Sequence, residues 1–289
     1  MKRPNMLVPT DFSEFSLKAF EAAASLSHLL GGTVTPFHAY LPVSEMDSFY
    51  YSGVGLSGHV DYEKVEASIK ERLQEVAGRL IAGKTLKPGR VGIGNPAYAV
   101  MEAGKEYDLI VMTTHGRTGF SRLLLGSISE KVLRMSHTPV LLVDHDTPLV
   151  PIERILLTTD LSTYSTHAFP YAAEIATLTG AGIDLLHVVV TDEYESESAL
   201  YDDMRNLEED LKNLIRTQFS ETLTVRPIVM ATDGSVHSAI VKCQENERYN
   251  LLVMATVGRT GLEYLMMGST ASHVARHVKT SMLSINPPR

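Results

Sequence analysis

The sequence predicts an α/β protein in which one doubly wound domain is written twice in tandem. The chain has 289 residues, and a single domain usually has roughly 100–200. Its two halves align with each other along two long blocks. Within each half, short apolar runs alternate with stretches of helical periodicity, which is the pattern of a parallel sheet covered by helices on both faces.

The internal repeat consists of two ungapped blocks in the same order. The opening segment of the first copy, from MLVPTDFSEFS onward, aligns with ILLTTDLSTYS and places Asp11 on Asp160. The later segment, YDLIVMTTHGRTGFSRLLLGSISEKVL, aligns with YNLLVMATVGRTGLEYLMMGSTASHVA and places Gly126 on Gly268. A repeat of this kind fixes the number of domains. We predict a short proline-containing linker between two domains, 1–146 and 152–289.

The first elements of each copy are a strand, a capped turn and a helix. The apolar run 6–8 is too short for a helix, which suits a buried parallel strand. The turn PTDFSEFS supplies serine and aspartate side chains, the residue types that cap helix N-termini. The helix expected over 16–32 is alanine-rich and ends at a glycine pair. The second copy repeats this order from Ile155.

The remaining elements continue the alternation. A second buried strand leads into a long charged helix whose apolar residues recur at spacings of three and four. A strand, a helix, a strong apolar strand, a short helix and a last strand complete the copy. The expected segments are, in that order, 33–40, 61–83, 87–92, 96–106, 108–115, 127–136 and 138–144 in the first copy, and 182–189, 201–220, 224–229, 236–247, 250–257, 269–278 and 280–286 in the second.

Composition narrows the class of function. The formal charge of −8 argues against a primary role with nucleic acid or an anionic membrane, because both require basic patches. The single cysteine, Cys243, excludes a disulfide within the chain and a thiolate cluster for a metal. No apolar stretch reaches the roughly 18 residues of a membrane span. We therefore expect a cytoplasmic protein with no nucleic-acid or membrane partner.

Two segments of each copy suit a ligand site. In a doubly wound sheet, ligands bind at the carboxyl ends of strands where the winding direction reverses. The first segment is the turn after the first strand, which contains Asp11 or Asp160. The second is the glycine-bearing loop after the fourth strand, 113–127 in the first copy and 255–269 in the second. Both segments fall at the same edge of the predicted sheet.

The glycine-bearing loop of the first copy has the chemistry of a phosphate site. Gly116 and Gly126 can adopt positive φ and let a ligand approach the backbone. Gly126 opens a helix whose unpaired N–H groups and dipole, equivalent to about half a positive charge, attract an anion. Ser127 and Ser129 add hydroxyl donors, and Arg117 adds charge. An ordinary turn followed by a helix cap has the same pattern, and these residues alone leave both interpretations open.

At these residues the sequence resembles the universal stress protein family. The matching segments are PTDFSE, VGIGNPAYAV and VMTTHGRTGFSRLLLGSISEKVLRMSHTPVLLV of the first copy, together with both ends of the second. ATP-binding members of that family carry G-x2-G-x9-G-[ST] in the last segment. The resemblance implies, for each copy, a five-stranded parallel sheet of order 3-2-1-4-5, related to the adenine nucleotide α-hydrolases.

The resemblance also implies a ligand and the residues that hold it. The ligand is ATP, or AMP or ADP in its place, with Mg2+ a candidate companion of the phosphates. The adenine and ribose end would lie against residues after the first, second and fourth strands, which are Pro9, Thr10, Asp11, Ala39, Met112 and Thr113. The phosphates would lie against Gly116, Gly126, Ser127, Ile128 and Ser129. The second copy offers Asp160, Val188, Gly258, Gly268 and Ser269.

The chain departs from the family pattern at both loops. Thr113 and Ala255 stand where the pattern has its first glycine, and each adds a Cβ that would crowd the ribose unless φ is negative there. The second copy departs further, because Ala271 replaces the hydroxyl of Ser129. We therefore expect the better preserved site in the first copy.

Three functions remain open. The leading hypothesis is a cytoplasmic stress-response protein that binds an adenine nucleotide with little or no catalysis. The alternatives are a nucleotide-free module that works through dimerisation and a slow adenylate hydrolase. Dedicated catalysis is disfavoured, because the sequence offers no evident nucleophile-and-base pair and no P-loop, nucleophile elbow or zinc-protease motif.

The histidines and the last strands carry two further expectations. His273 and His277 are four residues apart on one helix, but with no carboxylate or cysteine beside them we expect surface or interface side chains and no metal. His38 and His187 recur at one strand end and are expected in the core or the cleft. Family members often pair their last strands between subunits. We therefore expect a pseudo-dimer within this chain, with a homodimer left open, through pairing of 138–144 with 280–286.

Overall fold

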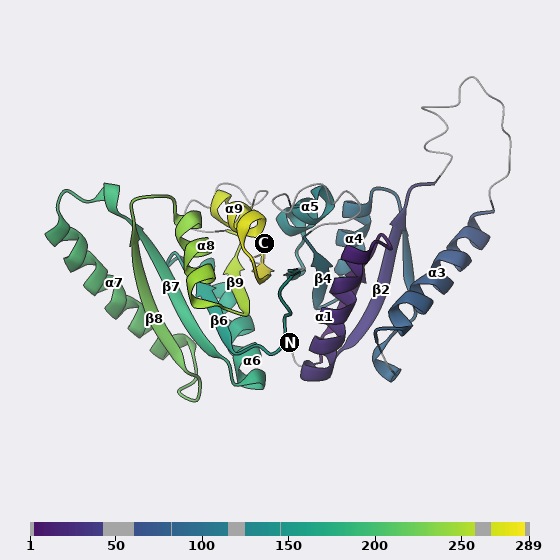
Figure 1. Cartoon of the computed structure of the whole chain (residues 1–289), viewed down its shortest axis with the longest axis horizontal. Helices are drawn as coiled ribbons and strands as arrows, with labels where there is room; N and C mark the ends of the chain where they lie inside the picture. Colours follow the sequence, from purple (N-terminus) through teal and green to yellow (C-terminus); the bar gives the residue numbers. More distant parts are fainter. Residues whose placement is uncertain are drawn as a thin grey trace, which may run out of the picture.

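The described residues of the computed structural model are 3–42, 61–81, 83–114, 125–144, 146–257 and 267–286. They form a ten-stranded sheet in the order β3-β2-β1-β4-β5-β10-β9-β6-β7-β8 (Figure 1). The first half of the chain contributes β1 to β5 and the second half β6 to β10. Counted within its own half, each set of five strands has the order 3-2-1-4-5, so the predicted fold class is confirmed.

The first half follows the predicted order of elements. Ser13 caps its first helix by accepting a hydrogen bond from the Ser16 N–H. Its second long helix ends at Gly78, earlier than predicted, because the chain turns there and buries Ile81. The elements are β1 Asn5–Pro9, α1 Glu14–Leu30, β2 Thr33–Tyr40, α3 Tyr62–Gly78, β3 Arg90–Ile93, α4 Pro96–Gly104, β4 Leu109–Thr113, α5 Ser127–Met135 and β5 Val140–Val143.

The second half repeats this order with a shorter first helix. A 3-10 turn, Ser165–Ala168, precedes the helix, because Pro170 has no N–H to donate to the carbonyl four residues earlier. The elements are β6 Arg154–Thr158, α6 Phe169–Thr179, β7 Gly182–Val190, α7 Glu197–Gln218, β8 Val225–Thr232, α8 Val236–Glu247, β9 Leu251–Ala255, α9 Ser269–His277 and β10 Ser281–Ile285.

The two halves join through their last strands. Strands β5 and β10 pair antiparallel, with Leu141 opposite Leu283 and Leu142 opposite Met282, whereas the strands within each half pair parallel to one another. The predicted pairing of the last strands within one chain is therefore present. It places the two halves side by side about an approximate twofold axis (Figure 1).

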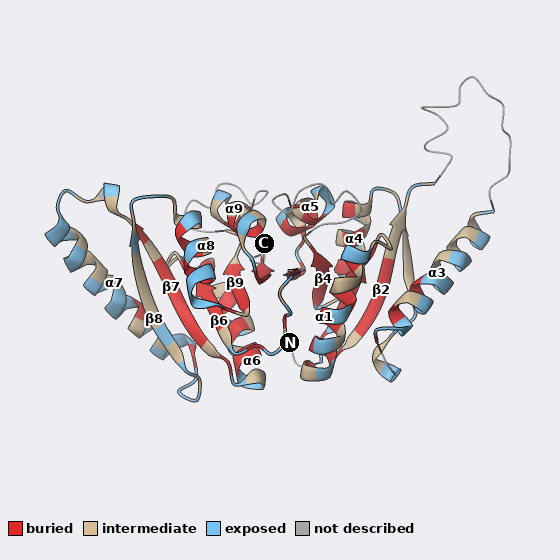
Figure 2. Ribbon diagram, in the orientation of Figure 1, coloured by how far each residue is buried: buried red, intermediate tan, exposed pale blue. Residues whose placement is uncertain are grey.

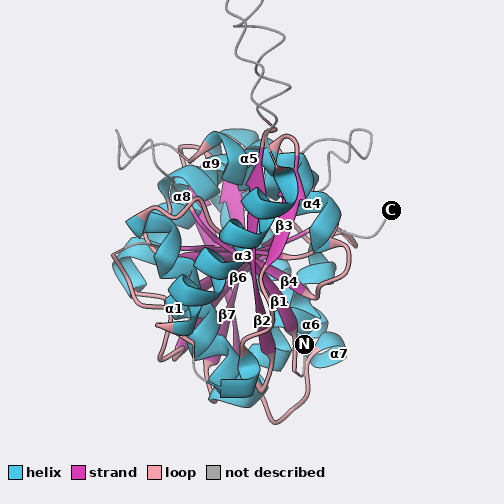
Figure 3. Cartoon of the chain, turned by 90° about the vertical axis from the view of Figure 1, so that its right-hand side faces the viewer, coloured by secondary structure: helices cyan, strands magenta, loops and turns pink. Residues whose placement is uncertain are grey.

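Helices cover both faces of the sheet, and each layer crosses from one half to the other. One hydrophobic cluster lies between the sheet and helices α1, α3, α6 and α7. A second cluster lies between the opposite face and helices α4, α5, α8 and α9. Figure 3 shows the strands enclosed between the two helical layers, and Figure 2 shows that burial is concentrated along the strands.

The outer helices α3 and α7 are amphipathic, as predicted. Each buries only a narrow stripe, represented by Leu73 and Ala77 in α3 and by Leu211 in α7. Most of their other residues are polar or charged, and are exposed or half-buried. Among the described residues, no helix has both the length and the apolar character needed to cross a membrane.

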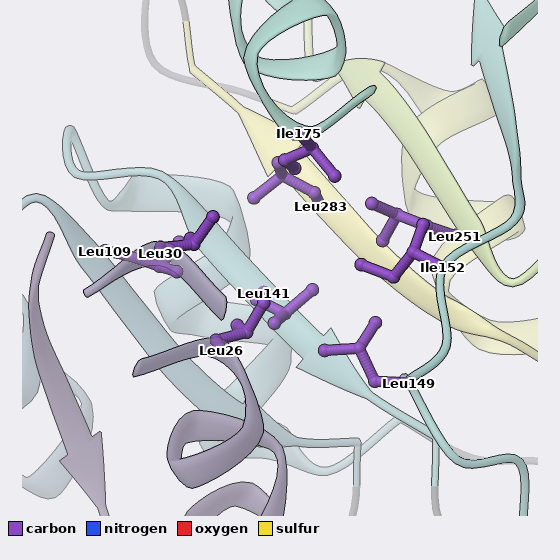
Figure 4. Close-up of a pocket in the computed structure, with 9 residues that line it drawn as sticks. All are labelled: Leu26, Leu30, Leu109, Leu141, Leu149, Ile152, Ile175, Leu251 and Leu283. Carbon is purple, nitrogen blue, oxygen red and sulfur yellow. The ribbon is translucent and has the colours of Figure 1, made fainter. Parts of the chain in front are cut away.

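The linker between the halves is part of the core. Leu149 and Ile152 are buried in the same cluster as α1 and α6. They line a small apolar cavity together with side chains from both halves (Figure 4). The other lining residues are Leu26, Leu30, Leu109, Leu141, Ile175, Leu251 and Leu283.

Candidate functional site

The winding of each half reverses between its first and fourth strands. Strand β1 lies beside β4, and the helices that follow them, α1 and α5, lie on opposite faces of the sheet. The same holds for β6 and β9. A crevice opens at the carboxyl edge of such a pair, so the two predicted segments of each half flank one crevice.

A hydrogen-bonded turn follows β1. The Oδ1 atom of Asp11 accepts hydrogen bonds from the Ser13 N–H at 3.0 Å and from the Ser13 hydroxyl at 2.5 Å. The hydroxyl oxygen of Thr10 accepts a hydrogen bond from the Phe12 N–H at 2.9 Å. These bonds hold Phe12 at a φ of 64°, a left-handed conformation that is costly for a bulky residue and is typical of functional turns.

The second half repeats this turn closely. Asp160 accepts from the N–H and the hydroxyl of Ser162 at 3.0 and 2.6 Å, and Leu161 also has a φ of 64°. In each half a histidine Nδ1 meets the carbonyl oxygen of the turn, His38 with Thr10 at 2.7 Å and His187 with Thr159 at 2.9 Å. Both histidines therefore lie where the sequence predicted, at a strand end beside the crevice, and brace the turn.

An aromatic and cationic stack distinguishes the turn of the first half. The ring of Phe12 lies 4.7 Å from the ring of His38, and the guanidinium of Arg72 from α3 lies 4.7 Å from the Phe12 centroid. Leu161 takes the place of Phe12 in the second half, so no such stack can form there. The sequence offered no signal for this contact, because Arg72 arrives from a helix that is distant in the chain.

The helix that follows β4 begins without a side-chain cap. Gly126 is its N-cap residue and, having no side chain, supplies no acceptor to the first turn. Helix α9 begins in the same way at Gly268. The described helices α1, α3, α4, α7 and α8 instead start at a serine, aspartate or asparagine that accepts a backbone N–H. Because first-turn N–H groups have no partner within a helix, those of α5 and α9 need an acceptor other than a capping side chain.

The glycines at these caps are not in the left-handed region. The φ of Gly126 is −60° and that of Gly268 is −57°, so Gly126 does not use the positive φ that glycine allows. Each cap N–H donates to the carbonyl at the end of the preceding strand, Gly126 to Thr114 and Gly268 to Thr256, both at 2.7 Å. A Cβ on Gly268 would lie 3.2 Å from the Thr256 carbonyl oxygen. Close approach of two backbone segments is the reason for glycine there.

The serine hydroxyls of α5 have different roles. Ser129 is buried and donates to the Thr113 carbonyl at 2.8 Å, so its hydroxyl fastens the helix to β4 instead of facing a ligand. Ser127 is exposed at the first helical position. In the second half Ala271 is buried at the place of Ser129, and α9 lacks this fastening bond.

The remaining predicted residues fall around the same edge, with three exceptions. Thr113 and Ala255 close strands β4 and β9 in extended backbone that any residue adopts, so their Cβ atoms impose no strain. Pro9, Ala39 and Val188 are half-buried at strand ends, Met112 is buried, and Ile128 and Ser269 are exposed at helix starts. Gly116, Arg117 and Gly258 lie outside the described residues.

Two histidines meet at the rim of the second half. The rings of His237 on α8 and His273 on α9 stack at 4.4 Å. Burial lowers the pKa of His237, and the charges of His273 and His277 lower it further. At the corresponding helix contact of the first half, the Lys131 ammonium lies 4.0 Å from the ring of Tyr98. The helical spacing in the sequence brings His273 close only to His277, because His237 lies on another helix.

The described part of the chain does not assemble a metal centre. None of its His, Cys, Asp and Glu side chains form a group of three or more that could hold a metal ion. The crevice instead combines carboxylate turns after β1 and β6 with N–H donors after β4 and β9. Such a pairing suits a ligand that has hydrogen-bond donors at one end and negative charge at the other.

Comparison with known proteins gives one consistent family. The model of the universal stress protein family matches residues 2–144 and 151–286. Universal stress protein MJ0531 of Methanocaldococcus jannaschii is 33% identical over 146 residues, covering 48% of this chain and 80% of its own. Universal stress protein Slr1230 of Synechocystis is 24% identical over 298 residues, covering 97% and 99% of the two chains.

A solved structure has the same fold over the whole chain. The crystal structure of a universal stress protein from Archaeoglobus fulgidus covers 98% of this chain and 96% of its own, with a TM-score of 0.65 and 24% identity. The fold of both halves is therefore similar to one already observed in a crystal.

Proposed function

Because the chain belongs to the universal stress protein family, we propose that it binds an adenine nucleotide, ATP first, in the crevice of its first half. The proposal describes a cytoplasmic stress-response protein of two domains, 1–146 and 152–289, with little or no catalysis. AMP or ADP would occupy the same place, and Mg2+ would accompany the phosphates.

The observation that carries the proposal is the uncapped start of α5. Its cap residue gives the first-turn N–H groups no side-chain acceptor, although the cap residues of most described helices do. A phosphate is the natural acceptor at such a helix end, because the N–H groups and the helix dipole both favour negative charge. The carboxylate turn after the neighbouring strand β1 lies at the other side of the crevice, where a ribose or base presents hydrogen-bond donors.

The first half is the stronger candidate of the two. Its helix is fastened to β4 by the Ser129 hydroxyl, which holds the N–H groups in position before a ligand arrives, and preorganisation of this kind favours binding. Its turn also carries the stack of Phe12, His38 and Arg72. The second half keeps the turn and the uncapped helix, with Ala271 and Leu161 at the corresponding places.

A matched pair of variants tests both the ligand and the choice of half. Ser127→Glu and Ser269→Glu each place a carboxylate in the first turn of an uncapped helix, where an acidic residue suits the helix dipole and preserves the fold. We expect ATP binding, measured by calorimetry, to fall about tenfold or more in Ser127→Glu through like-charge repulsion, and to change little in Ser269→Glu.

Mass spectrometry of the denatured, freshly purified protein provides the first readout. An adenine nucleotide that co-purifies with the wild type and is lost in Ser127→Glu supports the proposal. The absence of any such nucleotide, together with no heat on titration with millimolar ATP, would contradict it and leave a nucleotide-free interaction module. A turnover of ATP well above background would point to the hydrolase instead.

The pairing of β5 with β10 bears on the oligomeric state. Both last strands are already paired with each other inside the chain. We therefore propose that a homodimer, where one forms, uses a different surface from the last strand.

A further inference from the structure

One side chain links the candidate site of the second half to the helix of the first. Asn286 follows β10, and its Oδ1 atom accepts a hydrogen bond from the Thr256 hydroxyl. Its amide Nδ2 donates to the carbonyl oxygen of Ser136 and, at 3.3 Å, to that of Leu133. Thr256 belongs to the second half, whereas Ser136 and Leu133 belong to the first. Asn286 therefore bridges the two halves on the face that carries α5 and α9, which Figure 1 draws next to each other.

The Thr256 end of this bridge lies at the base of the second crevice. Thr256 directly follows β9, and its carbonyl accepts the N–H of Gly268, the cap residue of α9, at 2.7 Å. Its own N–H donates to Ile285 at 2.9 Å. The residue is buried. Any ligand that shifts the start of α9 therefore shifts the Thr256 carbonyl and, with it, the hydroxyl that holds Asn286.

The other end of the bridge is the carboxyl end of α5. Helix α5 has 9 residues and, at about 1.5 Å per residue, a length of roughly 13 Å. Leu133 lies in its last turn, and Ser136 is its C-cap. Last-turn carbonyls have no partner within a helix, and Asn286 provides one. Because so short a helix moves as a rigid body, holding its carboxyl end also positions the N–H groups at its start.

Among the described residues, the bridge has no counterpart in the opposite direction. Asp144 occupies the position of Asn286 in the first half, and its Oδ2 atom accepts the N–H groups of Asp146 and Thr147 at 3.1 and 2.7 Å. A carboxylate oxygen that accepts these N–H groups cannot act as the donor that a helix-end carbonyl needs, whereas an amide Nδ2 can. Asp144 therefore cannot hold the end of α9 as Asn286 holds the end of α5, and the link between the halves is asymmetric.

We propose that Asn286 is a positioning residue that couples the two crevices. It transmits the state of the Thr256 turn in the second half to α5, and hence to the nucleotide affinity of the first half. The expected effect on nucleotide affinity rests on the nucleotide site proposed above. By reciprocity, a ligand in the first half changes the Thr256 turn by the same coupling free energy.

The test uses the full chain in the Ser269→Glu background, which leaves one crevice for ATP. Into it we place Asn286→Ala, Thr256→Val and the double variant. We expect each single variant to weaken ATP binding about fivefold or more, the lower end of measured couplings. The double variant should be no weaker than the singles, because the residues act through one bridge. Ser281→Ala is the control, since it breaks another bond between the halves, Asp144 N–H to Ser281 Oγ at 3.2 Å, and should leave ATP affinity unchanged.

Hydrogen exchange of α5 gives a readout that needs no nucleotide. Thr256→Val should speed exchange of the α5 amides, although Thr256 lies in the other half, and Ser281→Ala should not. Unchanged exchange in Thr256→Val, additive losses of affinity in the double variant, or an equal effect of Ser281→Ala would each overturn the coupling. Should no variant bind ATP, the proposed function fails, while the exchange result still decides whether the bridge couples the halves.

Discussion

Asp184 on β7 receives two hydrogen bonds from Arg226 on the neighbouring strand β8, from Nε at 2.8 Å and from Nη2 at 2.9 Å. Arg154 and Tyr249 each donate to the same carboxylate at 2.8 Å. Only 3% of Asp184 is exposed. Burial raises the pKa of Asp184, but the hydrogen bonds from Arg226, Tyr249 and Arg154 outweigh it, so its pKa lies below the ordinary value. The carboxylate thus stays ionised inside the protein.

Asp184→Asn should destabilise the protein by about 2–4 kcal/mol, because Arg226 loses its carboxylate and Arg154 keeps only that of Glu247. The free energy of unfolding in urea measures the loss. Glu106→Gln is the control. The Glu106–Arg90 ion pair is exposed to solvent, so this substitution should change the free energy of unfolding little. Because the folded pKa of Asp184 is lowered, its contribution is present above the ordinary aspartate pKa and is lost as the pH falls through the folded value. Equal effects of the two variants would contradict this account.

Two serines of β10 should respond in opposite directions. Ser284 is 2% exposed, and its hydroxyl has no hydrogen-bond partner, whereas the hydroxyl of Ser281 accepts the Asp144 N–H. Ser284→Ala removes an unsatisfied buried group and should be neutral or stabilising by up to about 1 kcal/mol, while Ser281→Ala should cost about 1 kcal/mol. Thermal unfolding of both variants provides the comparison. A larger loss in Ser284→Ala than in Ser281→Ala would show that the Ser284 hydroxyl has a partner in solution.

The fold could be predicted from the sequence because the repeat and the alternation of short apolar runs with amphipathic stretches are local signals. Strand β4 and helix α8 fall where periodicity placed them. The 3-10 turn before α6 differs between the copies, although Pro170 in the sequence was a sufficient signal for it. Burial of Leu149 and Ile152 was not predictable, since two apolar residues in a proline-containing linker look the same in a free tether.

The candidate site was only partly predictable. The turn at Asp11 and the glycine before α5 stood out, because turn and cap residues follow local rules. The φ of Gly126 and the use of the Ser129 hydroxyl depend on how closely β4 approaches α5, which is a tertiary distance. Arg72 and His237 reach the crevices from helices far away in the chain, and a single sequence does not show which distant residues come into contact.

The stacked histidines should make stability depend on pH. The pKa of His237 is lowered by burial and by the charges of His273 and His277, so on acidification the unfolded chain takes up this proton before the folded chain does. His237 therefore costs the folded protein no stability above the ordinary histidine pKa of about 6.5. Below that pH the free energy of unfolding falls, because protonation of His237 favours the unfolded chain. His237→Ala should flatten the decline in urea midpoint between about pH 7.5 and pH 5. His137→Ala, at an exposed histidine, is the control, and a decline equally steep in His237→Ala would remove the stack as its cause.

The buried linker should behave as core. Leu149 and Ile152 are 4% and 3% exposed and line the cavity between the halves (Figure 4). Leu149→Ala and Ile152→Ala each enlarge that cavity and should cost about 2–4 kcal/mol of unfolding free energy, whereas Ala at exposed Glu153 should cost far less. Because both side chains line one cavity together with residues of α1, α6 and the strands of both halves, their loss should loosen the junction as well. Limited proteolysis of the linker measures this, and we expect cleavage to rise in Leu149→Ala and Ile152→Ala but not in Glu153→Ala. A wild-type linker already cut as fast as a free peptide would show instead that it is only a tether.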